Sequence, residues 1–173
     1  MRKTRLTRRL SFAAGFGATC AAAFAIAPHA AQAGPCDGVL PVAGEYSSGF
    51  GYRGRGFHPG VDIRAPYGAP ITAARAGRVV YAGRYFAYGL IVDVEHADGT
   101  VARYAHLSRI ASGVTPGAAI APNGSIGAVG RTGRTTGAHL HVELRIGGMP
   151  VNPWPWLTQT ACLEDRQVAE APR

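Results

Sequence analysis

The chain has 173 residues, a length that suggests one domain, and it carries 18 Lys and Arg against 10 Asp and Glu. The formal net charge of +8 overstates how basic the domain is, because five of the basic residues fall within the first nine positions. The rest of the chain contains 13 basic and all 10 acidic residues, which gives a net charge of +3. These basic residues form no run, so nucleic acid is not an expected partner.

The first 33 residues have the organisation of a secretory signal peptide. A basic start is followed by an apolar run over residues 10–27 and by Ala31-Gln32-Ala33 before a possible cleavage site. The pair Arg8-Arg9 would suit the twin-arginine route as well as the general secretory route, and the sequence leaves both open. We predict an exported protein, periplasmic or extracellular, with no stable membrane insertion after removal of the leader.

Three cysteines are present, and one of them, Cys20, lies in the leader. The other two, Cys36 and Cys162, lie near the two ends of the remaining chain. In an oxidising compartment we expect them to pair and close one long loop, a bond worth about 4 kcal/mol in the chain-entropy model. A catalytic thiol is not expected.

From Gly34 onward, short segments rich in Val, Ile, Tyr and Thr are separated by Gly and Pro, without a sustained helical period. We predict a compact all-β, mostly antiparallel domain over residues 34–162, a sandwich or open barrel, followed by a polar tail at 163–173. One short helical turn is expected at Leu107–Ile110. The predicted strands are Phe50–Tyr52, Val61–Arg64, Ile71–Ala74, Gly77–Ala82, Leu90–Glu95, Val101–His106, Ser125–Val129 and His139–Ile146.

The last predicted strand carries the first candidates for a functional site. Polar and aliphatic residues alternate there, so His139, His141 and Glu143 share one face of the strand. Neutral imidazole is a common ligand of transition metals, and two such rings either bind one ion together or divide metal binding and proton transfer between them. The alternative is a polar strand surface that faces solvent.

Two further histidines lie in suggestive positions. In His58-Pro59-Gly60-Val61-Asp62 the Pro-Gly pair excludes a helix, and the even spacing can bring the imidazole and the carboxylate to one side, which suits Zn²⁺. His106 ends a predicted strand and could also face solvent. His96 lies beside the turn Ala97-Asp98-Gly99, and we interpret it as a turn residue without a functional role.

Together these residues are sufficient for a catalytic zinc site, which needs three protein ligands and one open position. His58, Asp62 and one of the pair His139 and His141 would bind the metal. The other histidine of the pair and His106 would handle protons and developing negative charge.

Three segments resemble, in order, the signature blocks of the lysostaphin-type zinc metallopeptidases. They are Gly56-Phe57-His58-Pro59-Gly60-Val61-Asp62-Ile63, Arg103-Tyr104-Ala105-His106-Leu107-Ser108 and Gly130-Arg131-Thr132-Gly133-Arg134-Thr135-Thr136-Gly137-Ala138-His139-Leu140-His141-Val142-Glu143. The resemblance implies that His58, Asp62 and His141 bind one Zn²⁺ per chain. It also implies that His106 and His139 are catalytic residues that do not bind the metal. Glu143 would either orient a neighbouring ligand or face solvent.

The same resemblance implies hydrolysis of peptide bonds in the stem peptides or cross-bridges of peptidoglycan. Gly-rich loops at residues 53–57, 84–89 and 131–138 would wall a substrate groove, and Tyr85, Phe86 and Tyr88 either line it or pack at the end of a hairpin. We expect a monomer. Two other functions stay open: a non-catalytic binder or activator of cell-wall hydrolases, which the complete site disfavours, and a secreted protease of Gly-rich proteins.

Overall fold

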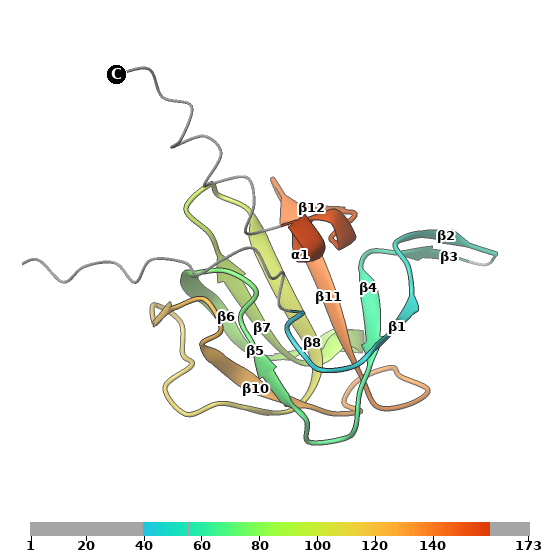
Figure 1. Cartoon of the computed structure of the whole chain (residues 1–173), viewed down its shortest axis with the longest axis horizontal. Coiled ribbons are helices and arrows are strands. Elements are labelled where there is room, and N and C mark those ends of the chain that lie inside the picture. Colours follow the sequence, from blue (N-terminus) through green and yellow to red (C-terminus); the bar gives the residue numbers. More distant parts are fainter. Residues whose placement is uncertain (1–39, 55, 160–173) are drawn as a thin grey trace, which may run out of the picture. The chain divides into compact units, whose positions relative to one another are not determined.

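The computed structural model describes residues 40–54 and 56–159. The predicted leader at 1–33, the cysteines Cys36 and Cys162 and the tail at 163–173 lie outside this range, so the leader, the disulfide and the tail stay predictions. The elements, coloured along the chain in Figure 1, are β1 (Glu45–Ser48), β2 (Gly51–Arg53), β3 (Gly56–His58), β4 (Val61–Arg64), β5 (Pro70–Thr72), β6 (Gly77–Tyr85), η1 (Phe86–Tyr88), β7 (Gly89–Glu95), β8 (Val101–Ile110), β9 (Ala119–Ile120), β10 (Ser125–Val129), β11 (His139–Ile146), β12 (Met149–Val151) and α1 (Trp154–Gln159).

Most of these strands form one 10-stranded antiparallel sheet with the order β1-β4-β11-β8-β7-β6-β9. β10 pairs with both β5 and β8, and β12 pairs with β11. β2 and β3 form a separate hairpin, which Figure 1 shows beside β4. The predicted all-β, mostly antiparallel fold is confirmed, and β11 lies inside the sheet between β4 and β8.

The strand predictions are most accurate where one face of a strand is fully buried. β4, β10 and β11 begin and end at the predicted residues, and inward residues such as Ile63, Ile126 and Leu140 have no exposed surface. β1, β3, β9 and β12 are not among the predicted strands, because these strands of two to four residues contain no buried position and so show no apolar alternation, unlike the equally short β4. The six-residue helix α1 is likewise not indicated by the pattern.

The predicted helical turn at Leu107–Ile110 is wrong, because β8 continues as a strand through these residues. β8 pairs with β11 as far as Ala105 and pairs with β10 from Leu107 onward, so a second strand satisfies the backbone where the first one ends. At the change of partner, His106 has a left-handed φ of 63°. Such a conformation is uncommon outside glycine and is typical of functional positions.

The apolar faces of the sheet strands form one core. It includes Val61 and Ile63 of β4, Tyr104 of β8, and Leu140 and Val142 of β11. Because side chains alternate along a strand, the polar residues between these positions point to the other face of the sheet, where they can form a site. Within residues 40–54 and 56–159, no helix is both long and apolar enough to cross a membrane.

Candidate metal centre and active site

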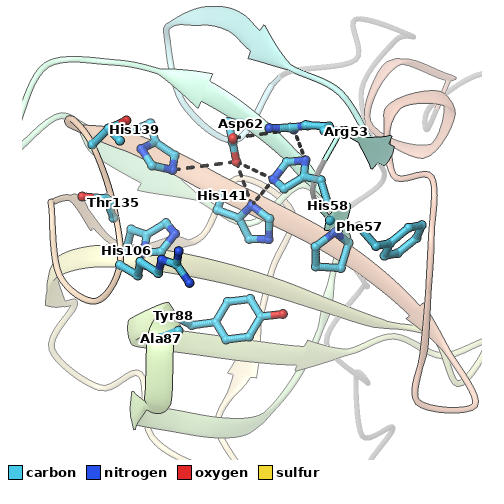
Figure 2. A pocket seen from close by; sticks show the side chains of 14 residues that line it. Arg53, Phe57, His58, Asp62, Ala87, Tyr88, His106, Thr135, His139 and His141 are labelled. Carbon is cyan, nitrogen blue, oxygen red and sulfur yellow. Dashed lines mark hydrogen bonds and ion pairs between the residues drawn. The ribbon is translucent and has the colours of Figure 1, made fainter.

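Three side chains from β3, β4 and β11 meet on the polar face of the sheet. Asp62 is the direct cross-strand partner of His141, and His58 ends β3 just before the turn into β4. The His141 Nδ1 atom lies 2.7 Å from Asp62 Oδ1, and His58 Nε2 lies 3.1 Å from each of these two atoms. Figure 2 shows the three side chains converging. The same-side arrangement predicted for His58 and Asp62 is therefore present.

Gly60 allows the turn between β3 and β4 to approach β11. A Cβ atom at this position would lie 2.2 Å from the carbonyl oxygen of Val142 and 2.9 Å from Cε1 of His141. Only a residue without a side chain permits such a close approach. The Pro59-Gly60 pair thus sets how near His58 comes to His141.

The donor atoms fit a transition metal ion such as Zn²⁺. Ligand atoms about 2.0–2.2 Å from a tetrahedral zinc ion lie roughly 3.4 Å from one another, and the three donors here are 3.1, 3.1 and 2.7 Å apart, so a small outward movement of Asp62 or His141 would accommodate the ion. The outer nitrogen of His141, Nε2, is 3.3 Å from Glu143 Oε1, so an N–H donated to this carboxylate leaves the inner nitrogen with a lone pair for a metal. The outer nitrogen of His58, Nδ1, lies 2.6 Å from the Gly49 carbonyl oxygen and also contacts the Arg53 guanidinium.

The ionised carboxylate of Asp62 favours a cation at this point. Burial would raise the pKa of the Asp62 carboxyl, but hydrogen bonds with His141 and His58 outweigh burial and hold that pKa well below its usual range. Burial would lower the pKa of His141, but its hydrogen bonds with Asp62 and Glu143 raise it. The Asp62 carboxylate is therefore ionised at neutral pH and attracts positive charge.

His106 and His139 each present a free ring nitrogen near the three donors. Nδ1 of His106 lies 2.8 Å from the Thr132 carbonyl oxygen and Nδ1 of His139 lies 3.0 Å from the Gly137 carbonyl oxygen, so each ring donates an N–H to the backbone. The centroids of the two rings are 4.8 Å apart. Nε2 of His139 lies 3.8 Å from Asp62 Oδ1. All five residues selected from the sequence thus meet in one place.

The environment of His106 keeps its imidazole neutral. Burial lowers the pKa of His106 to about 4, and the nearby rings of His139 and His141 act in the same direction, against the hydrogen bond with Thr132. At neutral pH the Nε2 atom of His106 can therefore accept a proton.

These residues lie in a cleft of about 660 Å³. Each of the three loops expected to wall a groove contributes to it, which confirms their placement: residues 53, 56 and 57 from the first, 87 and 88 from the second, and 134–136 from the third. Figure 2 shows Arg53 and Phe57 on one side of the histidines and Ala87 and Tyr88 on another. The cleft is lined by Arg53, Gly56, Phe57, His58, Pro59, Asp62, Ala87, Tyr88, His106, Arg134, Thr135, Thr136, His139 and His141.

The three aromatic residues of the β6–β7 connection divide between the two expected roles. Tyr88 lines the cleft. Tyr85 packs at the hairpin end, with its ring centroid 4.7 Å from the Arg103 guanidinium carbon. Phe86 is 90% exposed and contacts the ring of Tyr85. Only Tyr88 is therefore placed to meet a molecule bound beside the histidines.

Glu143 is buried, so the alternative that it faces solvent is wrong. Its Oε1 atom accepts a hydrogen bond from the Tyr88 hydroxyl at 2.5 Å, and its Oε2 atom accepts one from the Arg145 guanidinium. Burial would raise the pKa of Glu143, but the hydrogen bonds with His141 and Tyr88 outweigh it and lower the pKa. The side chain is thus a buried carboxylate directly behind His141.

Asp93 and Arg103 are two buried charged residues that the sequence interpretation misses. Each is 7% exposed, and Arg103 donates from Nε and Nη2 to Oδ1 and Oδ2 of Asp93 at 2.8 and 2.7 Å. A charged residue at an alternating position of a buried strand is the signal that could reveal them. His96, by contrast, lies at the turn after β7 and its Nδ1 donates to the Ala76 carbonyl oxygen, as expected for a turn residue.

A family model described as peptidase family M23 matches residues 56–153, the range that holds all five site residues. The chain is 44% identical over 115 residues to the DD-carboxypeptidase/endopeptidase Mpg of Neisseria meningitidis serogroup B, covering 62% of this chain and 26% of that protein. It is 36% identical over 124 residues to the murein hydrolase activator NlpD of Salmonella dublin, covering 69% of this chain and 31% of that protein. The chain thus matches about a quarter to a third of the length of these relatives.

A solved structure has the same fold as this chain. The antimicrobial peptidase lysostaphin from Staphylococcus simulans matches with a TM-score of 0.63 at 28% identity, covering 69% of this chain and 50% of that one. The lysostaphin-type resemblance inferred from the three sequence blocks is therefore confirmed. Because the family match covers more than half of the chain, the protein belongs to peptidase family M23.

Proposed function

We propose that this protein is an exported zinc metalloendopeptidase that hydrolyses peptide bonds in the stem peptides or cross-bridges of peptidoglycan. The observation that carries the proposal is the completeness of the site. His58, Asp62 and His141 supply three converging donors, and His106 and His139 add two rings with free nitrogens in the same cleft. Loss of any one of the five would leave either the metal or the proton transfers without a partner.

The proposed cofactor is one Zn²⁺ per chain, held by His58, Asp62 and His141. Bound there, zinc would supply Lewis-acid chemistry, lowering the pKa of a water molecule and polarising the scissile carbonyl. His106 and His139 share the remaining tasks: one takes up the proton of the attacking water and passes a proton to the leaving amine, and the other, once protonated at its free nitrogen, donates to the developing oxyanion. Removal of a donor to the oxyanion typically raises the activation free energy by roughly 3 kcal/mol.

The chemistry of the cleft supports an extended, partly anionic peptide as substrate. Arg53 and Arg134 bring positive charge to its lining, and Phe57 and Tyr88 bring aromatic surface. Stem peptides of peptidoglycan carry free carboxylates and small residues, which suit such a lining. The relative from Neisseria meningitidis, named as a DD-carboxypeptidase/endopeptidase, supports the same class of substrate.

Export to the periplasm or the cell exterior is part of the proposal and rests on residues 1–33. The protein is proposed to act there as a monomer without membrane insertion, with Cys36 and Cys162 paired. N-terminal sequencing of the secreted protein, expected to begin at Gly34, and mass analysis after alkylation test these points.

A second candidate function is activation of another cell-wall hydrolase, because the relative from Salmonella dublin is named as a murein hydrolase activator. The two functions differ in whether the purified protein cuts by itself. A protease of Gly-rich proteins is a third candidate, which a panel of protein substrates separates from a cell-wall enzyme.

The decisive experiment is digestion of defined muropeptides by the zinc-loaded protein, followed by mass analysis. The proposed function predicts new amino termini at a stem peptide or cross-bridge, and none with the His141→Ala variant. A wild-type protein that holds one zinc ion and leaves every muropeptide intact would rule out the enzyme and favour the activator.

A further inference from the structure

A row of buried charges crosses the sheet on the face that also carries the metal-site residues of β11. Asp93 on β7 is the cross-strand partner of Arg103 on β8, which in turn is the partner of Glu143 on β11. Directly paired residues share one face of a sheet, so negative, positive and negative charges lie side by side. The three side chains are 7%, 7% and 0% exposed. Burial of a charge costs free energy unless an opposite charge lies beside it, and here Arg103 lies between the two carboxylates.

Two tyrosines from the β6–β7 connection lie over Arg103 and contribute to its burial. The ring centroids of Tyr85 and Tyr88 lie 4.7 and 4.9 Å from the guanidinium carbon. The bidentate bond to Asp93 fixes the guanidinium in its plane, and the two rings pack against it. The position of Tyr88 is therefore set by a rigid, buried group.

Tyr88 links this row to the metal-binding histidine. Its hydroxyl donates to Glu143 Oε1 at 2.5 Å, and the same oxygen lies 3.3 Å from His141 Nε2. Arg145 donates to the second oxygen of the carboxylate. Glu143 is thus fixed by contacts on both oxygens while one of them faces the outer nitrogen of His141.

The contact orients the ring of His141 for a metal at Nδ1. Both ring nitrogens face carboxylate oxygens, Nδ1 that of Asp62 at 2.7 Å and Nε2 that of Glu143 at 3.3 Å, and a carboxylate oxygen can only accept. With a metal at Nδ1, which also lies 3.1 Å from His58 Nε2, the hydrogen of the imidazole lies on Nε2 and is donated to Glu143. Carboxylates that accept from metal-binding histidines orient the ring and strengthen the ligand.

We propose that Glu143 is the positioning residue for His141, and that Tyr88, itself held by the Asp93–Arg103 pair, fixes Glu143 in the geometry this role requires. The inference rests on the proposed function insofar as the metal at His141 is zinc. It adds that the β6–β7 connection, which walls the cleft, also helps to orient the metal ligand His141. Tyr88 of this connection lines the cleft and donates a hydrogen bond to Glu143, the residue behind His141.

The test measures zinc affinity of the full protein by competition with a chelator of known strength. Glu143→Gln keeps the size of the side chain and removes its charge, and zinc affinity is expected to fall by about 10- to 100-fold. Tyr88→Phe removes only the hydroxyl and is expected to lower the affinity by less. Glu95→Gln is the matched control, because Glu95 is an exposed residue at the end of β7 whose substitution should leave the affinity unchanged.

A second readout follows the proton itself. In nitrogen-resolved NMR of the zinc-loaded protein, the Nε2–H signal of His141 is expected to show the downfield shift and slow exchange of a hydrogen donated to a carboxylate, and Glu143→Gln is expected to move it upfield and to speed its exchange. Thermal unfolding of the zinc-free variants shows that they are folded. If Glu143→Gln binds zinc within twofold of wild type and leaves the Nε2–H signal unchanged, the positioning role is wrong while the metal site stands. If wild type itself binds no zinc, the proposed function and this inference fail together.

Discussion

The Nε2 atom of His58 and the Nδ1 atom of His141 lie 3.1 Å apart, although the two residues are 83 positions apart in the sequence. At its other nitrogen the ring of His141 faces the Glu143 carboxylate, and the ring of His58 lies near the Gly49 carbonyl oxygen and the Arg53 guanidinium. Two lone pairs that face each other at this distance repel unless a positive charge lies between them. The pair, with Asp62 beside it, is therefore arranged for a cation.

The two histidines of β11 are expected to have different functions. His141→Ala should lose bound zinc and peptidase activity together, because it removes a donor. His139→Ala should keep zinc and lose turnover by about 100-fold or more, the usual effect of removing an acid–base group. Metal analysis of both purified variants, combined with muropeptide digestion, checks the division. Loss of zinc in His139→Ala would contradict it.

Removal of His58 should have the same effect on zinc binding as removal of His141. His58→Ala removes a donor that lies 3.1 Å from the other two, so zinc occupancy after purification should fall well below one per chain. Full occupancy in this variant, measured by atomic emission, would refute His58 as a ligand.

Removal of the metal should lower stability as well as activity. A ligand that binds only the folded protein stabilises it by about 2.7 kcal/mol when its free concentration is 100 times the dissociation constant. Treatment with a chelator is therefore expected to lower the melting temperature and abolish hydrolysis, and added Zn²⁺ should restore both. An unchanged melting temperature would mean that the three donors do not hold a metal.

Gly60 offers a backbone test of the site. Gly60→Ala places a methyl group 2.2 Å from the Val142 carbonyl oxygen, so the turn must move away from β11 at a cost of about 1–3 kcal/mol. We expect a lower melting temperature and weaker zinc binding. Gly56→Ala is the control, because a Cβ atom there meets nothing within 4 Å. Equal effects of the two substitutions would show that the close approach of the turn is unimportant.

The pH dependence of stability should report the neutral His106. Its pKa is lowered from 6.5 to about 4 in the folded protein, so the unfolded chain binds the extra proton. Above pH 6.5 both the folded and the unfolded protein hold His106 neutral, and the free energy of unfolding is unaffected by it. As the pH falls from 6.5 toward 4, protonation of His106 in the unfolded chain lowers the free energy of unfolding. Chemical unfolding of the chelator-treated protein between pH 7 and 4.5 should show a smaller loss for His106→Gln than for wild type. Identical losses would contradict the shift.

The sequence by itself determined the local geometry of the site. Alternation in residues 139–146 placed His139, His141 and Glu143 on one face of a strand, because successive side chains point to opposite sides. The Pro-Gly turn and the even spacing placed His58 and Asp62 on one side. The bounds of β4, β10 and β11 also follow from sequence, since register is strict where one face is fully buried.

Only the tertiary structure decided what these faces meet. The extension of β8 beyond His106 depends on β10, a partner that no local pattern reveals, so the same residues are compatible with a turn until the partner is known. The role of Glu143 likewise depends on Tyr88 and on the register that sets it beside Arg103, which decide between the two alternatives that the sequence left open and make Glu143 a buried carboxylate. Periodicity assigns a side chain to a face, whereas long-range strand pairing and burial decide its neighbours and hence its chemistry.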